Sequence, residues 1–228
     1  MSGKLLDCVT IETDSNPSAA VIWLHGLGAD GNDFAPMVPE LGLPDELAVR
    51  FIFPHAPTMP ITCNNGYVMR AWYDIVHFDQ ISRQADIAGV KASVQYVRDL
   101  IADQNAKGIP THRIILAGFS QGGAIAYTAG LTHPEPLAGI VCLSTYLPDE
   151  SLLSQNSIAA NQATPLLAAH GSFDPVVGLA LGEKAKNYVS GLGVDVVWQT
   201  YPIQHSVCLP EIQLIGQFIN QQLGTAGV

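Results

Sequence analysis

The stretch Gly118-Phe119-Ser120-Gln121-Gly122-Gly123 decides how this chain folds. The aliphatic run Arg113 to Ala117 precedes it, and the small, helix-compatible residues Ala124 to Tyr127 follow it. This is the G-x-S-x-G pattern of a sharp strand-to-helix turn, in which glycines let backbones pass closely and the serine hydroxyl is lifted out of the sheet. The pattern is short, and a turn that merely joins two elements is its structural alternative. The flanking runs favour a strand, an exposed serine and a helix, in this order.

Strand-length apolar runs recur on both sides of this turn. Besides Arg113 to Ala117, they are Val9 to Ile11, Ala20 to Leu24, Val49 to Phe53, Gly139 to Leu143, Pro165 to Ala169 and Val194 to Trp198. The apolar spacing predicts helices over Ile87 to Ile101 and Ile212 to Leu223. Several strands are continuously apolar, which is typical of a parallel sheet covered on both faces. We therefore expect an α/β fold with a mostly parallel central sheet and helices on both faces.

Nothing in the sequence divides the chain, so we expect a single domain over residues 1–228. Pro148 to Ala163 reads as a polar connection rather than a linker between domains. The segment Pro54 to Gln80 lacks strong periodicity but contains Trp72, Ile75 and Val76. Long loops with large apolar residues often line binding sites, so we expect this segment to be such a loop.

Composition excludes several classes of function. Lys plus Arg is 10 and Asp plus Glu is 20, and this charge of -10 without a basic cluster speaks against nucleic-acid binding. No apolar run reaches the length of a membrane span, so we expect no stable membrane insertion. An early Asp7 interrupts any signal-peptide core, which indicates a cytoplasmic protein. Cys8, Cys63, Cys142 and Cys208 are too scattered for a zinc site or a disulfide framework, so we expect no metal.

A serine needs a histidine base and an acid to become a nucleophile at neutral pH, in the order serine, acid, histidine for this kind of turn. Asp174 follows the run Pro165 to Ala169, which places it at the same sheet edge as Ser120; Asp149, after the preceding strand, is the competing acid. His205 is the only histidine downstream of Asp174. We therefore predict Ser120, Asp174 and His205 as the catalytic residues.

Acyl transfer also needs donors for the developing oxyanion. The usual pair is the amide after the nucleophile and an amide from the loop after an earlier strand. These are the N–H groups of Gln121 and of Leu27, the latter in His25-Gly26-Leu27-Gly28 directly after Ala20 to Leu24. Each such donor contributes about 2.7 to 4 kcal/mol in the transition state.

A second glycine motif supports a rival from another class. Gly26-Leu27-Gly28-Ala29-Asp30-Gly31 matches G-x-G-x-x-G, the phosphate-binding turn of dinucleotide-binding proteins. That interpretation needs an acid about 20 residues further on, and Val49 to Pro54 offers none. A nucleotide-binding protein is therefore a distant alternative. A non-catalytic binding protein is another, but it requires a broken triad that the sequence does not show.

Several motifs together resemble one family. They are Trp23-Leu24-His25-Gly26-Leu27-Gly28, Pro54-His55-Ala56-Pro57, Trp72-Tyr73-Asp74, Gly118-Phe119-Ser120-Gln121-Gly122-Gly123, His170-Gly171, Asp174-Pro175-Val176-Val177 and His205-Ser206. From about residue 8 to residue 222 the chain resembles the carboxylesterase and acyl-protein thioesterase family, the phospholipase/carboxylesterase type of serine hydrolase. Bacterial members look closest.

This resemblance implies an α/β-hydrolase fold without a large cap domain. It implies the same triad and the same oxyanion donors as the residues themselves. It also implies an acyl-chain channel bordered by apolar residues, for which ordinary core packing is the alternative role. These residues are Trp72, Ile75, Val76 and Val176.

We predict a serine hydrolase that cleaves carboxylic esters of short to medium acyl chains through an acyl-enzyme, without a cofactor. The alternative is an acyl-protein thioesterase or lysophospholipase that acts on long acyl groups. The partners expected of the protein are small-molecule or lipid acyl ester substrates, or an acylated protein. The family resemblance implies a monomer or a homodimer.

Overall fold

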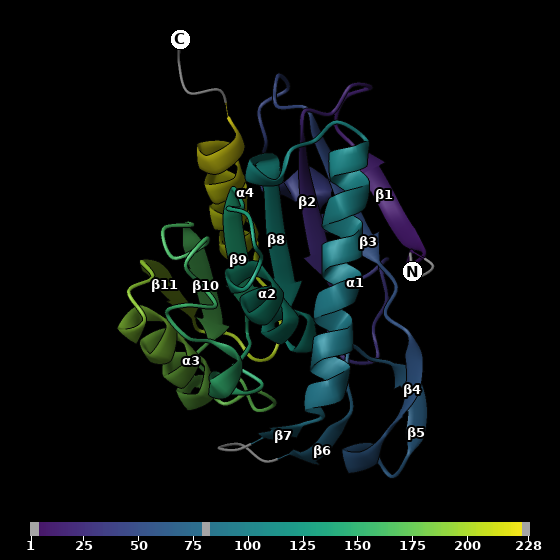
Figure 1. The fold of residues 1–228 in the computed structure, drawn as a ribbon, viewed down its shortest axis with the longest axis vertical. Helices are drawn as coiled ribbons and strands as arrows, with labels where there is room; N and C mark the ends of the chain where they lie inside the picture. Colours follow the sequence, from purple (N-terminus) through teal and green to yellow (C-terminus); the bar gives the residue numbers. More distant parts are fainter. Residues whose placement is uncertain (1–4, 79–82, 225–228) are drawn as a thin grey trace.

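A seven-stranded sheet in the order β1-β3-β2-β8-β9-β10-β11 forms the centre of the protein (Figure 1). The computed structural model describes residues 5–78 and 83–224. The strands of the sheet are β1 (Cys8–Glu12), β2 (Ala19–Leu24), β3 (Val49–Pro54), β8 (Ile114–Phe119), β9 (Gly139–Leu143), β10 (Leu166–Gly171) and β11 (Val196–Tyr201). Edge strand β1 is antiparallel to β3, and the other neighbours are parallel. The predicted mostly parallel sheet is confirmed, and each predicted run overlaps one of these strands.

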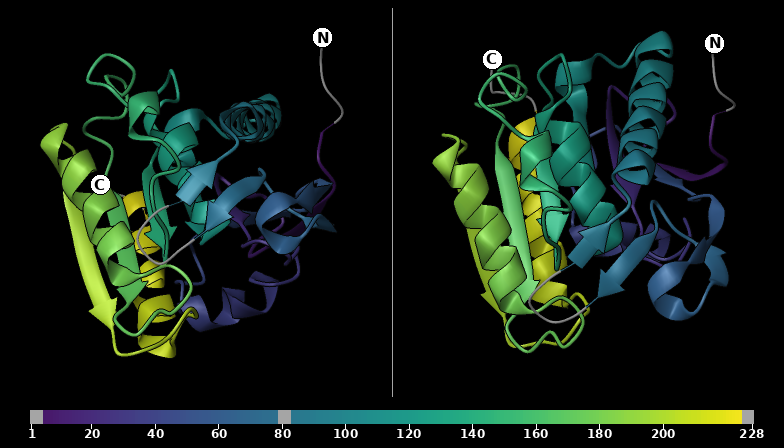
Figure 2. Two further views of the ribbon diagram at one scale, coloured as in Figure 1. Left: turned by 90° about the horizontal axis from the view of Figure 1, so that it is seen from below. Right: turned by 60° about the horizontal axis from the view of Figure 1, so that its bottom comes forward.

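Helices cover both faces of the sheet, as predicted (Figure 2). Helices α1 (Ile87–Ala106), α2 (Gln121–Leu131) and α3 (Leu179–Gly191) pack on one face, whereas α4 (Leu209–Leu223) and the 3-10 helix η1 (Ala35–Leu41) pack on the other. Side chains of β2 alternate between the two apolar cores, with Ile22 in one and Val21 in the other. This two-sided burial explains why the central strands are continuously apolar.

Two of these helices were predicted from their apolar spacing. In α1 the expected face is buried, and the helix begins at the N-cap Asp86, whose carboxylate accepts a hydrogen bond from the Ala88 amide at 3.0 Å. The helix continues past the predicted end at Ile101 to Ala106. In α4 the predicted stretch from Ile212 is extended at its start to Leu209. Helix α3 was not predicted.

The segment Pro54 to Gln80 is not the long loop that the sequence suggested. It forms a hairpin of β4 (Thr58–Ile61) and β5 (Tyr67–Arg70), joined through the 3-10 turn η2 (Thr62–Asn64), and then β6 (Ile75–Phe78), which pairs with β7 (Arg83–Ala85). Its end at Gln80 lies outside the described residues. Asn65 and Gly66 adopt left-handed φ values of 53° and 73°, the conformation that Asn-Gly favours in a hairpin turn.

Both hairpins lie near the ends to which the arrows of the parallel strands point (Figure 1). The described residues form no large cap domain, in agreement with the prediction. The connection Pro148 to Ala163 contains the 3-10 turn η4 (Glu150–Leu152) and buries Leu153 and Ile158; the 3-10 turn η3 (Thr111–Arg113) leads into β8. Within the described residues, no helix is both long and apolar enough to cross a membrane. The single domain over residues 1–228 stays a prediction.

Candidate active site

Ser120 lies at the sharp turn between β8 and α2, with φ 54° and ψ −118°. A non-glycine residue at positive φ costs about 1 to 3 kcal/mol, and such strain gathers at functional sites. The turn depends on glycine, because a Cβ on Gly118 would collide with the Gly122 carbonyl and a Cβ on Gly122 would collide with the carbonyls of Leu24 and His25. The Ser120 amide donates to the Leu143 carbonyl at 2.9 Å, so β9 holds the turn in place.

The three residues predicted for catalysis lie in one hydrogen-bonded chain. His205 Nε2 is 2.9 Å from Ser120 Oγ, and His205 Nδ1 is 2.6 Å from Asp174 Oδ2. With Nδ1–H donating to the carboxylate, Nε2 is free to accept the serine proton. The His205 ring also packs against Phe119, with ring centroids 4.8 Å apart. The base is therefore held by a carboxylate on one side and an aromatic ring on another.

Asp174 is held ionised in the loop after β10. Burial by itself raises its pKa, but hydrogen bonding and the charge of His205, together with the amides of Val176 and Val177, outweigh burial and lower the pKa below its ordinary value. Both amides donate to Oδ1 at 2.8 Å. The buried ring of His170 closes the same loop through Nε2, which donates to the Val177 carbonyl at 2.8 Å. Burial lowers the pKa of His170, so this ring is neutral.

The competing acid has a different role. Asp149 caps the 3-10 turn η4, and its carboxylate accepts a hydrogen bond from the Ser151 amide at 2.8 Å. It forms no hydrogen bond with His205, whose Nδ1 contacts Asp174 instead. The structure therefore brings Asp174 rather than Asp149 to the histidine.

Both predicted oxyanion donors line the cavity that contains Ser120 and His205. The Gln121 amide is in the first turn of α2 and thus lacks an acceptor within the helix. The Leu27 amide forms no hydrogen bond with another described residue. Gly26 brings its loop against the elbow, because a Cβ there would lie 3.5 Å from the Ser120 Cβ. Two amides are thus available beside the serine hydroxyl.

A buried hydrogen-bond network ties these two loops together. The Gln121 side chain accepts from the Trp72 amide at 2.9 Å and donates to the Tyr73 carbonyl at 2.7 Å. The Trp72 indole N–H then donates to the His25 carbonyl at 2.8 Å, and His25 Nε2 accepts from the Ala56 amide at 3.1 Å. Sequence reasoning assigned no such role to the side chains of Gln121 and Trp72. The network holds the loop that carries Leu27 at a fixed place relative to the elbow.

The cavity beside Ser120, called the site cavity below, has a volume of about 210 Å³. Of the four residues predicted to border an acyl channel, Ile75 and Val176 line it. Trp72 is 1% exposed and belongs to the buried network, and Val76 is 44% exposed, so neither contributes to the cavity lining. The remaining lining residues are Gly26, Leu27, Ala29, Asp33, Phe119, Ser120, Gln121, Tyr146 and His205.

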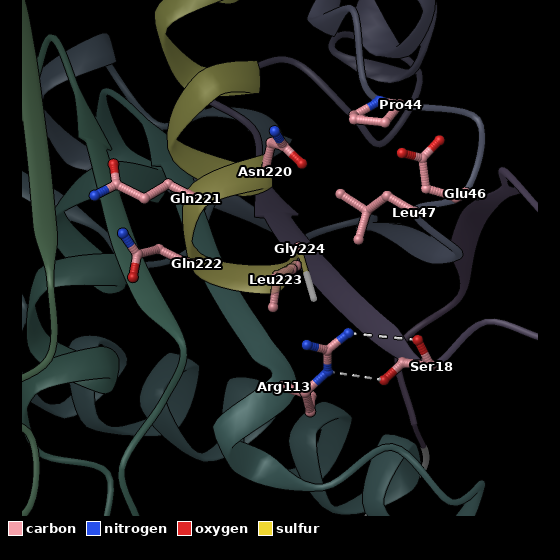
Figure 3. Close-up of a pocket in the computed structure, with 10 residues that line it drawn as sticks. All are labelled: Ser18, Pro44, Glu46, Leu47, Arg113, Asn220, Gln221, Gln222, Leu223 and Gly224. Carbon is pink, nitrogen blue, oxygen red and sulfur yellow. Dashed lines mark hydrogen bonds between the residues drawn. The ribbon is translucent and has the colours of Figure 1, made fainter. Parts of the chain in front are cut away.

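A larger hollow of about 610 Å³ lies at the C-terminal end of α4, away from the elbow (Figure 3). Its residues are Ser18, Pro44, Glu46, Leu47, Arg113, Asn220, Gln221, Gln222, Leu223 and Gly224. The Arg113 guanidinium donates to the carbonyl and hydroxyl oxygens of Ser18 at 3.3 and 3.4 Å. None of the lining residues is a histidine or a cysteine. This hollow therefore lacks a nucleophile and base pair of the kind found at Ser120.

The G-x-G-x-x-G stretch, Gly26 to Gly31, packs against the turn that carries Ser120. Gly26 packs against Phe119 and Ser120, and the Gly31 amide donates to His55 Nδ1 at 3.1 Å. Arg50, the only charged residue of the following strand, forms an ion pair with Glu12 at 2.7 Å. The motif thus positions the loop that carries Leu27, and the nucleotide-binding alternative finds no support in its surroundings.

Comparison with known proteins shows the family to which this chain belongs. The model of the Phospholipase/Carboxylesterase family matches residues 6–223. Acyl-protein thioesterase 1 of Neurospora crassa is 41% identical over 218 residues, which cover 90% of this chain and 87% of that protein. Acyl-protein thioesterase 1 of Gibberella zeae is 38% identical over 234 residues, covering 97% of each. The crystal structure of Arabidopsis thaliana SOBER1 is 30% identical with a TM-score of 0.83, covering 90% of this chain and 99% of that one.

The mostly parallel sheet, the strained serine turn and the cavity beside it define an α/β-hydrolase fold. The chain belongs to the phospholipase/carboxylesterase family and is a serine hydrolase. The two curated relatives named above are fungal, so they lend no support to the expected closeness to bacterial members.

Proposed function

We propose that the protein hydrolyses carboxylic esters of short to medium acyl chains, with Ser120, His205 and Asp174 as its triad. The observation that carries this proposal is the hydrogen-bonded chain from Ser120 Oγ through His205 to Asp174, at 2.9 and 2.6 Å. Ser120 and His205 line a cavity together with Leu27 and Gln121, and the amides of these last two residues would bind the oxyanion.

The reaction has two steps. His205 Nε2 takes the Ser120 proton while Oγ attacks the acyl carbonyl, and the amides of Leu27 and Gln121 stabilise the tetrahedral oxyanion. The imidazolium then protonates the leaving group, which departs and leaves an acyl-enzyme. A water molecule activated by His205 repeats the sequence and releases the acid. Asp174 keeps the imidazole in the required tautomer and stabilises its cationic form.

The size of the site cavity supports the choice of acyl chain. Its volume of about 210 Å³ is below the range of roughly 300 to 1,000 Å³ that is typical of small-molecule pockets. Ile75, Tyr146 and Val176 provide its apolar wall. A short or medium acyl chain fits such a space without rearrangement, whereas a long chain needs further room.

The names of the relatives support a second candidate. Proteins that are 41% and 38% identical to this chain are called acyl-protein thioesterase 1. The same two steps cleave a thioester, because a thiol then leaves in place of an alcohol. Under this candidate the substrate is an acylated protein, or a lipid acyl ester if the enzyme acts as a lysophospholipase.

The cysteines bear on the cellular compartment in which the enzyme acts. Cys8, Cys142 and Cys208 carry free thiols, which supports a reducing compartment such as the cytoplasm. The oligomeric state, monomer or homodimer, stays a prediction.

The test is a rate profile over p-nitrophenyl esters from acetyl to palmitoyl, with an acyl-CoA thioester of matched chain, for wild type and Ser120→Ala. An optimum at short or medium esters that Ser120→Ala abolishes supports the first candidate. A preference for thioesters or long chains supports the second. Equal rates for Ser120→Ala and wild type would contradict both.

A further inference from the structure

The site cavity has two chemically different sides. Ile75, Tyr146 and Val176 belong to, or pack against, the apolar core under α1, α2 and α3. Phe119 packs against the other core, which contains Phe34. Ser120 and His205 lie in the same cavity lining. An acyl chain on the first, apolar side leaves the second side for the leaving group.

A carboxylate lines the second side. Asp33 belongs to the cavity lining and directly precedes Phe34, whose ring lies 5.6 Å from the ring of Phe119. Phe119 in turn lies 4.8 Å from the His205 ring. Because a histidine base of this kind delivers its proton to the departing atom, the leaving group exits beside His205. Asp33 is therefore placed on the side from which the alcohol or thiol departs.

No cation of the described residues neutralises this carboxylate. Asp33 is exposed, and its side chain forms no hydrogen bond or ion pair with another described residue. Partial desolvation of the Asp33 carboxyl, and after it the neighbouring Asp30, raise the pKa of Asp33, and no positive charge among the causes of the shift opposes them. Hydrogen bonds from Asn32 lower the pKa of Asp30, so a second charge stands nearby. A positively charged group of a substrate would stabilise the ionised form of both carboxylates.

The charge of the whole chain acts in the same direction. A net charge of -10 creates a negative potential that raises the local concentration of cations and speeds their encounter with the site. Such steering weakens as salt shortens the range of the field.

We propose that Asp33 makes the enzyme prefer acyl donors whose leaving group carries a positive charge. The inference rests on the proposed hydrolase function and specifies its substrate class. The shared chemistry is an ammonium group close to the scissile bond. Two sources offer it: an ester of an amino alcohol such as choline, and an S-acyl cysteine beside a lysine.

A pair of isosteric esters tests the preference. Butyrylcholine is compared with its neutral carbon isostere, in which a tert-butyl group replaces the trimethylammonium group. The measured quantity is kcat/KM for the cationic ester divided by kcat/KM for the neutral one. We expect this ratio to exceed one in wild type and to fall about fivefold in Asp33→Asn, the size of one exposed charge pair. Asp33→Glu should restore the ratio, and added salt should lower it in wild type.

Asp45→Asn is the matched control, because it removes the same charge from an exposed position of the η1–β3 connection. Its ratio should equal that of wild type. The same loss in Asp45→Asn would overturn the inference, and so would equal ratios in wild type and Asp33→Asn both for these esters and for the peptides described next. Hydrolysis of the neutral ester reports the proposed function separately, so failure of the ratio and failure of the function are distinguishable.

A second pair of substrates separates the two sources. S-butyryl cysteine peptides with lysine or glutamine next to the acylated residue are compared in the same way. A ratio that depends on Asp33 for the peptides but not for butyrylcholine assigns the preference to proteins, and the reverse assigns it to amino-alcohol esters. Dependence in neither pair would contradict the proposal.

Discussion

The side-chain carbonyl of Gln121 accepts a hydrogen bond from the backbone amide of Trp72 at 2.9 Å. The same side chain donates to the Tyr73 carbonyl at 2.7 Å, and Gln121 also lines the site cavity. One residue thus carries a predicted oxyanion donor and also holds in place the segment that anchors the loop containing Leu27, the other predicted donor.

Gln121→Ala should therefore impair both stability and activity. It removes the acceptor of the buried Trp72 N–H and a donor to the Tyr73 carbonyl, and the loss of a buried hydrogen-bond partner costs about 1 to 3 kcal/mol. We expect the free energy of unfolding in urea to fall by about 3 kcal/mol and kcat to fall with it. Ser120→Ala is the control, because it removes the hydroxyl but keeps these hydrogen bonds. Unchanged stability of Gln121→Ala would show that the network does not brace the site.

The acid of the triad can be tested against its competitor. Asp174→Asn should lower kcat about ten-thousand-fold, because an amide favours the wrong imidazole tautomer, whereas the fold should persist. Asp149→Asn removes the charge but keeps a side-chain oxygen that can cap η4, so it should change kcat less than twofold and leave stability nearly unchanged. Steady-state rates and circular dichroism of both variants decide the matter. A large loss of kcat in Asp149→Asn alone would reverse the assignment.

Glu211 in the first turn of α4 makes stability depend on pH. It is 1% exposed, and neither carboxylate oxygen forms a well-aligned hydrogen bond with a described donor. Burial raises its pKa from 4.5 to about 7, against a smaller opposite effect of the Cys208 amide. Between these values the folded protein holds a proton that the unfolded chain releases. The free energy of unfolding should therefore fall as pH rises through this range.

Glu211→Gln should remove this decline. The full difference in pKa corresponds to a loss on the order of 3 kcal/mol in wild type above pH 7. Urea unfolding from pH 4.5 to 8 should show Glu211→Gln more stable than wild type at the upper end only. Glu40→Gln, at an exposed position, should follow wild type. Parallel curves for wild type and Glu211→Gln would refute this interpretation.

The elbow glycines can be probed with a matched pair of alanines. Gly122→Ala places a Cβ against the backbone carbonyls of Leu24 and His25 and should destabilise the protein by roughly 3 kcal/mol or prevent folding. A Cβ on Gly191 in α3 meets nothing within 4 Å, so Gly191→Ala should be tolerated. Thermal unfolding of both variants measures the difference. Equal melting temperatures would mean that β2 and α2 separate easily.

The sequence predicted the elements whose signal is local. Continuous apolar runs indicated the central strands, because burial on both faces leaves no alternation. Chain order and the shared edge of parallel strands were enough to propose Ser120, Asp174 and His205 together. The hairpin turn at Asn65-Gly66 also had a local signal, which the sequence interpretation overlooked.

Other features depend on contacts between distant residues. Gly182 lies inside α3, where glycine is unfavourable, and its missing Cβ makes room for the imidazole of His170. Trp72 was expected in an acyl channel, but its indole donates to the His25 carbonyl in the buried network. Neither relationship is visible from composition, periodicity or motif spacing.

Covalent labelling tests the central claim most directly. A fluorophosphonate reacts with an activated serine by forming an O–P bond and releasing fluoride, so intact-mass and peptide mass spectrometry locate the nucleophile. We predict one adduct per chain, on Ser120, that is lost in Ser120→Ala and strongly slowed in His205→Ala. An adduct on another residue, or equal labelling of Ser120→Ala, would contradict the account.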